Sequence, residues 1–425
     1  MTYSASPPHP LRLRSLDGAR GLAALIVLIH HCALTVPEFA NLYLIGAIPA
    51  EGTVAWWLNA TPLKIFTAGG EAVLLFFVLS GLVVSLPVLR AKTFDWAGYY
   101  ITRTMRLWIP VAASLVLAAV WVTLVDGDPG LTVSKWVKGS DVPSLEWQEV
   151  VLGFDAMRGP TRINNPLWSL QWEFIFSLLL PVFVGIAVVL RRWTAATVTV
   201  CTALGVVGVL NGIGYLIYLT AFLTGAALTF PVLGRTRRHR PRGAPIWSKA
   251  LWLAILFAGI LLMCAYWSML VGGVTDSFIL AVGKALALPG AVLLVLCAVF
   301  SRNVARFLEW APVQWLGKIS FSLYLVHVPI IMMFSRLFGS DHWMRALLFA
   351  VPASFAAAWI FSKLVELPSH RLAKHTGRWI SAKMVAYVAA SSVPVQAQAH
   401  AERVLVSSAP GDQGDRPTQK SPAIR

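Results

Sequence analysis

The first apolar segment of this chain contains an arginine and a histidine that simple membrane crossing does not require. Arg20 and His31 lie eleven positions apart in the run RSLDGARGLAALIVLIHHC. A helix rises about 1.5 Å per residue, so the two Cα atoms are separated by roughly 16 Å along its axis. This spacing pairs a fixed cation at one membrane face with an imidazole near mid-depth. The alternatives are an ordinary flanking charge at Arg20 and a hydrogen-bonded packing residue at His31.

A second pair of cations stands near the start of the third apolar segment, in ITRTMRLWIP. Arg103 and Arg106 are three positions apart and therefore share a helix face. Two guanidinium groups on one face can each donate paired hydrogen bonds to phosphate oxygens. Pro110 is expected to kink the helix and lean its basic end toward the interior of a bundle. A positively charged cytoplasmic loop would carry the same arginines, so a purely topogenic role stays open.

One carboxylate is expected inside the membrane. Glu173 stands in NNPLWSLQWEFIF, inward of the level that Trp168 and Trp172 mark. An acid at such a depth needs a partner or a water-filled cavity, which favours a functional role.

Three further ionisable side chains are weaker candidates. His30 projects about 100° away from its neighbour His31, so only one of the two faces a given site. His327, in KISFSLYLVHVPI, is also at membrane depth, where a hydrogen bond to a neighbouring helix explains it as well as catalysis does. Glu366, near the end of the last segment, resembles an interfacial anchor.

The composition identifies an integral membrane protein. Of 425 residues, 57% are hydrophobic and 13% are charged, whereas soluble proteins average about 25% charged residues. The net charge of +16 does not indicate a nucleic-acid partner, because the basic residues fall in short clusters between apolar segments. Such clusters are typical of loops beside anionic lipid. The four cysteines lie in separate apolar stretches without paired spacing, so we predict neither a metal site nor a disulfide framework.

Ten apolar segments predict an all-α fold consisting of a single bundle of about ten transmembrane helices. Basic residues flank one set of loops and acidic residues the other, which predicts that both termini are cytoplasmic. The long loop near 126–166 is expected to be a lid or a substrate-facing platform. The expected segments run near residues 16–36, 69–89, 107–125, 167–190, 194–211, 213–232, 250–271, 277–300, 316–337 and 344–365.

The chain divides into three expected parts. Residues 1–15 form a cytoplasmic segment that leads into an uncleaved signal anchor, since no small-residue cleavage site follows the first span. Residues 16–375 form the membrane domain. Residues 376–425 form a cytoplasmic tail that is expected to be largely disordered, because its composition cannot bury a core.

Several of these stretches together resemble the acyltransferase 3 family of integral membrane acyltransferases. The resemblance rests on the Arg20, ten residues, His31 spacing and on FFVLSGLV, TRTMRLWIP, WSLQWEFIF, GKISFSLYLVHVPI and VELPSHR. It covers residues 11–375. Members of the family O-acylate sugars, polysaccharides, lipids and macrolides in bacteria. The resemblance implies transfer of an acyl group, commonly acetyl from acetyl-CoA, to a hydroxyl-bearing acceptor, without a metal, by a multi-pass protein of the bacterial plasma membrane.

The expected depth of each side chain in the membrane suggests its role in this reaction. Arg20, Arg103 and Arg106 lie toward the cytoplasmic face and can hold the phosphates of acyl-CoA. His31 would act as general base on the acceptor hydroxyl, or would carry a transient acyl group. Glu173 would orient the imidazole of His31 or bind a sugar hydroxyl. We expect the cationic side chains at the inner mouth and the imidazole deeper down to line one common cavity.

Two other function classes fit part of the pattern. A secondary transporter or exporter of a small or lipid-linked molecule would also carry charges near the midplane. A membrane scaffold that has lost activity is less consistent with the sequence, since nothing would then retain five ionisable groups at membrane depth. Acyl transfer by the purified protein discriminates between these classes.

Overall fold

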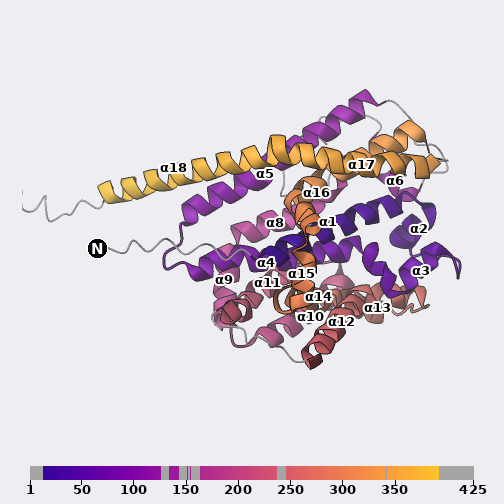
Figure 1. Cartoon of the computed structure of the whole chain (residues 1–425), viewed down its shortest axis with the longest axis horizontal. Helices are drawn as coiled ribbons and strands as arrows, with labels where there is room; N and C mark the ends of the chain where they lie inside the picture. Colours follow the sequence, from indigo (N-terminus) through magenta and orange to yellow (C-terminus); the bar gives the residue numbers. More distant parts are fainter. Residues whose placement is uncertain are drawn as a thin grey trace, which may run out of the picture.

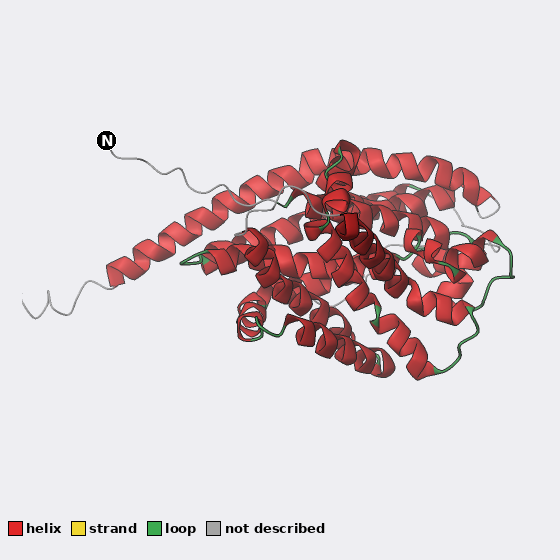
Figure 2. Ribbon diagram, turned by 60° about the horizontal axis from the view of Figure 1, so that its bottom comes forward, coloured by secondary structure: helices red, strands yellow, loops and turns green. Residues whose placement is uncertain are grey.

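In a computed structural model, the described residues form helices joined by short connections, with no strand among them (Figures 1 and 2). The protein is an all-α integral membrane protein. The end of the bundle from which α18 (Leu367–Ser391) extends, at the left of Figure 1, is the end predicted to be cytoplasmic. Three short helices, α2 (Pro37–Ile45), α3 (Val54–Ala60) and α6 (Lys135–Ser140), lie at the opposite end, which is predicted to face outward. The structure describes residues 13–125, 134–142, 151, 154, 163–236, 246–339 and 342–391.

Within these ranges, nine helical stretches are long and apolar enough to cross a membrane, and one bent pair completes a tenth span. This agrees with the predicted bundle of about ten. The bent pair joins α8 (Trp168–Leu178) to α9 (Leu180–Val189) at 68°. The other spans are α1 (Arg14–Leu34), α4 (Gly69–Arg90), α5 (Trp96–Leu124), α10 (Thr194–Asn211), α11 (Gly214–Thr236), α12 (Ile246–Val271), α13 (Ser277–Ala285) with α14 (Ala287–Phe300), α16 (Ala311–Phe338) and α17 (Trp343–Phe361).

The third span begins earlier than the sequence predicted. Asp95 caps α5 by accepting a hydrogen bond from the Gly98 amide at 2.9 Å. The helix therefore starts at Trp96 rather than near 107. Consequently Arg103 and Arg106 lie inside a membrane helix and not in the loop before it.

Close backbone contacts hold α1 against α16. A Cβ atom at Gly21 would overlap the backbone of Gly317, and one at Gly18 would overlap the Leu308 carbonyl just before α16. Helices in lipid associate through such close packing of small residues, because lipid tails give no hydrophobic drive. The contact fixes the position of the α1 side chains relative to those of α16.

Prolines interrupt the helices that form the centre, and specific side chains repair the breaks. Pro181 follows the bend between α8 and α9 and cannot donate to the Ser177 carbonyl. The Tyr99 hydroxyl donates to that carbonyl at 3.2 Å, and Tyr100 donates to the Leu178 carbonyl at 3.0 Å. Both tyrosines lie on α5, so this repair also ties the inner end of α8 to α5.

A second break is repaired from the other side of the bundle. Pro329 inside α16 leaves the Leu325 carbonyl without its helical donor. The side-chain amide of Asn164, which is fully buried just before α8, donates to this carbonyl at 2.9 Å. The start of α8 is thereby joined to the middle of α16.

The C-terminal helix differs from the expected tail. A π-helical turn, Ser362–Glu366, joins α17 to α18 (Leu367–Ser391). Pro368 explains the wide turn, because its ring would clash with the Leu364 carbonyl in a regular α-helix. The expected disordered tail thus begins as helix as far as Ser391, and the rest of it lies outside the described residues. α18 packs on α5 and extends beyond the bundle (Figure 1).

Replacement of Asn164 by alanine tests the repair of α16. The Leu325 carbonyl would lose its donor in a membrane interior, so we expect the free energy of unfolding to fall by about 1–3 kcal/mol. The matched control is Asn211→Ala, because Asn211 makes the same type of bond, 2.8 Å to the Val207 carbonyl, on an exposed helix end. We expect that control to change stability by less than about 0.5 kcal/mol. Unfolding in detergent measures both, and equal effects would contradict the repair.

Candidate active site

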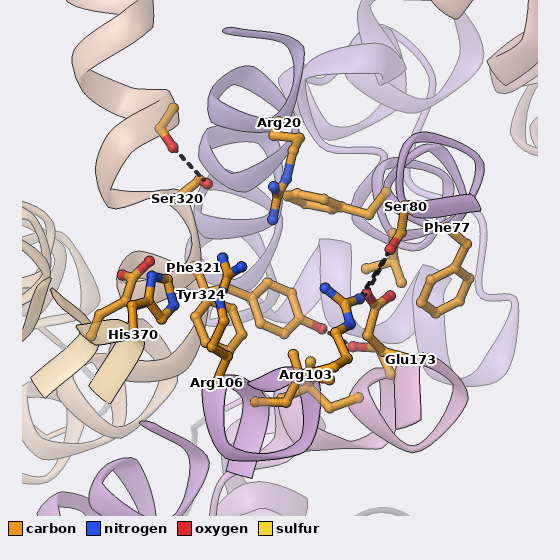
Figure 3. Close-up of a pocket in the computed structure, with 17 residues that line it drawn as sticks. Arg20, Phe77, Ser80, Arg103, Arg106, Glu173, Ser320, Phe321, Tyr324 and His370 are labelled. Carbon is orange, nitrogen blue, oxygen red and sulfur yellow. Dashed lines mark hydrogen bonds and ion pairs between the residues drawn. The ribbon is translucent and has the colours of Figure 1, made fainter. Parts of the chain in front are cut away.

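The structure brings four of the five predicted site residues into one central cavity of about 160 Å³ (Figure 3). Arg20 reaches it from α1, Arg103 and Arg106 from α5, and Glu173 from α8. His31 does not line this cavity. The predicted common cavity is therefore correct for the three cations and wrong for the histidine, and it also contains Glu173.

Arg103 and Glu173 form an ion pair within a small polar network. The Arg103 guanidinium contacts Glu173 Oε1 and also donates to Ser177 Oγ at 3.1 Å. Ser80 Oγ, from α4, donates to the same Glu173 oxygen at 2.6 Å. Glu173 thus contacts an arginine and a serine and does not reach His31, so the expected orientation of the imidazole by Glu173 is not what the structure shows.

The other two arginines remain available. Neither Arg20 nor Arg106 forms a hydrogen bond or ion pair with any described residue, and both line the cavity. Figure 3 shows Arg106 and Arg20 around the same space as Arg103. Two guanidinium groups without partners at this depth constitute a site for an anion with several oxygens.

Two residues that the sequence analysis did not place in the site also line the cavity. Glu366 is only 8% exposed, accepts a 2.5 Å hydrogen bond from Ser322 Oγ, and is not the interfacial anchor that we expected. His370 lies one turn further along α18 and faces the same space. Pro368 was the available sequence signal for these two residues, because a proline predicts an irregular turn in the helix. Irregular π-turns inside helices are frequent at functional sites.

A wider vestibule of about 570 Å³ leads from the central cavity toward the predicted cytoplasmic end. It shares all three arginines with the central cavity. Its remaining wall includes the aromatic side chains of Phe94 and Tyr99. A large anionic ligand can therefore reach the arginines from the predicted cytoplasmic end.

His31 lines a separate outer chamber of about 420 Å³. The wall of this chamber is rich in aromatic rings. Trp168 and Trp172, one turn apart on α8, both pack on Tyr218, with ring centroids 5.2 and 5.1 Å away. Trp136 lies above His31, with ring centroids 5.4 Å apart.

A thin wall separates the two chambers. Among the described residues, only Val73 and Tyr324 line both the central cavity and the outer chamber. Tyr324 is held in place because its hydroxyl lies 2.6 Å from Ser169 Oγ and 2.9 Å from the Pro166 carbonyl oxygen. The cations and His31 are therefore neighbours on two sides of one tyrosine.

A second histidine contacts His31. His327 Nε2 lies 3.0 Å from His31 Nδ1, and His327 Nδ1 lies 2.9 Å from the Leu323 carbonyl oxygen. His31 Nδ1 is also 3.0 Å from the Val27 carbonyl oxygen. Both rings are buried inside the helical bundle. His30 instead bonds through Nδ1 with the Thr67 carbonyl at 2.9 Å.

The described part of the long outer loop is anchored rather than loose. Ser134 Oγ donates to the Leu34 carbonyl at 2.6 Å, which places α6 (Lys135–Ser140) over the end of α1. Arg336 from α16 forms an ion pair with Asp141 at 2.7 Å. These two contacts hold the segment in place over His31. Most of the loop expected to be a lid lies outside the described residues.

The ion pair predicts that replacing Arg103 lowers the stability of the protein, whereas replacing Arg106 does not. Arg103→Gln would leave Glu173 without its counter-charge, so we expect a loss of about 2–4 kcal/mol of stability, less than for a fully buried pair because the side chains are 18% and 14% exposed. The double variant Arg103→Gln with Glu173→Gln should recover most of that loss. Arg106→Gln, which breaks no pair, should not lower stability. Thermal unfolding in detergent gives all three values, and a double variant no more stable than Arg103→Gln would contradict the coupling.

Comparisons with known proteins identify relatives of this chain. The chain is 25% identical over 354 residues to a Bacillus subtilis (strain 168) protein named "Putative peptidoglycan O-acetyltransferase YrhL", and the match covers 76% of this chain and 49% of that one. The chain therefore spans about half the length of that relative. It is also 25% identical over 365 residues to the O-acetyltransferase PaAT-1 of Phomopsis amygdali, with 74% and 71% of the two chains covered.

No solved structure gives a significant match to the chain. The family model described as "Acyltransferase domain", that of the acyltransferase 3 family, matches residues 13–363. This match covers nearly all of the membrane bundle, including all five predicted site residues. The chain therefore belongs to the acyltransferase 3 family and is a multi-pass membrane protein.

Proposed function

We propose that this protein transfers an acetyl group from acetyl-CoA, which enters at the cytoplasmic end, to a hydroxyl group of an acceptor in the outer chamber. The observation that carries the proposal is the position of three arginines and one histidine on two sides of Tyr324. A polyanion and a hydroxyl substrate can thus approach each other from opposite membrane faces. Family membership favours this function over the transporter alternative.

The donor side follows from charge. CoA carries several phosphate groups and a long flexible arm that ends in the thioester. Arg20 and Arg106 have free guanidinium groups that can bind phosphate oxygens in the vestibule and central cavity. The arm would then extend past Tyr324 toward His31, which requires the tyrosine side chain to move.

The acceptor side follows from the aromatic wall of the outer chamber. A sugar ring has apolar C–H faces and hydroxyl edges, and it can stack on indole rings such as those of Trp168 and Trp172. Carbohydrates, lipid-linked glycans and secondary metabolites with sugar-like rings are the acceptors that fit. The relatives named as O-acetyltransferases support transfer to oxygen. The bacterial plasma membrane is the proposed location.

In the proposed reaction, His31 acts as general base. Its imidazole removes the proton from the acceptor hydroxyl while the oxygen attacks the thioester carbonyl. The C–S bond then breaks, and the CoA thiolate takes the proton back from His31. Glu173 has no part in this proton transfer and instead holds Arg103 in place.

Replacement of His31 by alanine should remove the general base. We expect kcat for acetyl transfer to fall by about 100- to 10,000-fold with little change in CoA binding. The control His342→Ala changes an exposed histidine at the outer end of α17 and should retain activity. Radiolabelled transfer from acetyl-CoA by the purified protein measures both. Near-normal turnover in the His31 variant would exclude its role as the base.

Replacement of Arg106 by glutamine should weaken the donor complex. Loss of a charged hydrogen bond to phosphate costs about 1.5–3 kcal/mol, which raises KM for acetyl-CoA about tenfold or more. Arg191→Gln, at an exposed arginine that lines none of the three cavities, is the matched control. If both variants bind CoA equally well in titration calorimetry, only a topogenic role remains for Arg106.

A further inference from the structure

We propose that His327 is a positioning residue that sets the protonation form of His31 and stabilises the positive charge that His31 acquires during acyl transfer. This inference deepens the proposed function and rests on it. His327 lines none of the three cavities in the described part of the chain, so it acts through His31 and not on a substrate.

The protonation form of His327 follows from its backbone partner. A carbonyl oxygen can only accept a hydrogen bond, so His327 Nδ1, 2.9 Å from the Leu323 carbonyl, must carry a hydrogen. A neutral imidazole carries one hydrogen only. His327 Nε2 therefore has a lone pair, and this is the atom directed at His31.

The protonation form of His31 follows in turn. Its Nδ1 has two neighbours that accept hydrogen bonds, the Val27 carbonyl oxygen at 3.0 Å and the Nε2 lone pair of His327 at 3.0 Å. His31 Nδ1 must therefore be the protonated nitrogen. The lone pair is left on His31 Nε2, which forms no hydrogen bond with a described residue and belongs to a ring that lines the outer chamber. That is the form a general base requires.

The same contact has a second consequence during the reaction. When His31 Nε2 accepts the acceptor proton, the ring becomes a cation that must be stabilised away from water. His327 Nε2 accepts from Nδ1–H and so can share this charge, as the carboxylate does in a serine-protease triad. No Asp or Glu lines the outer chamber among the described residues.

A histidine suits this position better than a carboxylate would. An isolated carboxylate at mid-depth would bury a charge in the resting protein, which is costly in a membrane. A neutral imidazole fixes the same form of His31 without a permanent charge. The surrounding packing keeps it there, since His327 is 1% exposed and lies beside Tyr324, with ring centroids 6.0 Å apart.

The kinetic test compares two replacements of His327. His327→Phe keeps an aromatic ring but cannot accept a hydrogen bond from His31. We expect kcat to fall about 10- to 100-fold, which is the usual loss when the hydrogen-bond partner of a metal-binding histidine is removed. His327→Gln offers an amide oxygen at a similar reach and should recover most of that loss. KM for acetyl-CoA should not change in either. The control is Ser354→Ala, which removes another buried bond to a helix carbonyl, 2.7 Å to Ala350, away from the chambers.

Nitrogen-15 NMR of histidine-labelled protein tests the assignment without any activity. We expect a protonated Nδ1 and a non-protonated Nε2 on His31, and a correlation across the hydrogen bond from His31 Nδ1 to His327 Nε2. A protonated Nε2 on His31 would overturn the proposal, as would a Phe variant with normal kcat. Absence of acetyl transfer in the wild type alongside the expected NMR signals would instead overturn only the proposed function.

Discussion

The constraint on which this structure depends is that no water is present in the bilayer core to satisfy a broken helix. Prolines interrupt the helices around the site, and three of these breaks are accommodated: by Tyr99 and Tyr100 at the α8 bend, by Asn164 at Pro329, and by a π-turn at Pro368. The hydrogen bonds at the first two breaks join α5, α8 and α16. The helices that carry Arg103, Arg106, Glu173 and His327 are therefore fixed to one another by hydrogen bonds that prolines make necessary.

The division into two chambers has a chemical advantage. If the cations and the imidazole faced one open cavity, water and protons could reach the thioester together with the acceptor, and hydrolysis would compete with transfer. Tyr324 separates them with a side chain that is held by two hydrogen bonds to the α8 entry. In the proposed reaction, a donor that displaces Tyr324 must provide enough binding energy to break those bonds, and contacts of its phosphates with the arginines would supply that energy.

The sequence predicted what depends on local pattern. Hydropathy located all ten spans, and the positions of Arg20, Arg103 and Arg106 correctly indicated one cavity. The sequence did not reveal which of these side chains contact one another. The pairing of His31 with His327 joins residues 296 positions apart, and only the crossing of α1 and α16 at Gly21 and Gly317 decides it. Glu366 was misjudged because its position near the end of the last span suggested an interfacial anchor, and the π-turn that contains it is a tertiary outcome.

Charge balance explains why one arginine is paired and two are free. Three cations around a cavity of about 160 Å³ repel one another strongly at low dielectric, so an empty site with three free guanidinium groups would be unstable. Glu173 neutralises Arg103, and the carboxylate of Glu366 lies on the same cavity as Arg20 and Arg106 without bonding to either. In the resting site the positive charge of the arginines is therefore only partly neutralised, and the guanidinium groups of Arg20 and Arg106 keep unused hydrogen-bond donors. The polyanionic donor that we propose would neutralise the remaining positive charge, so its binding would relieve the repulsion among the arginines.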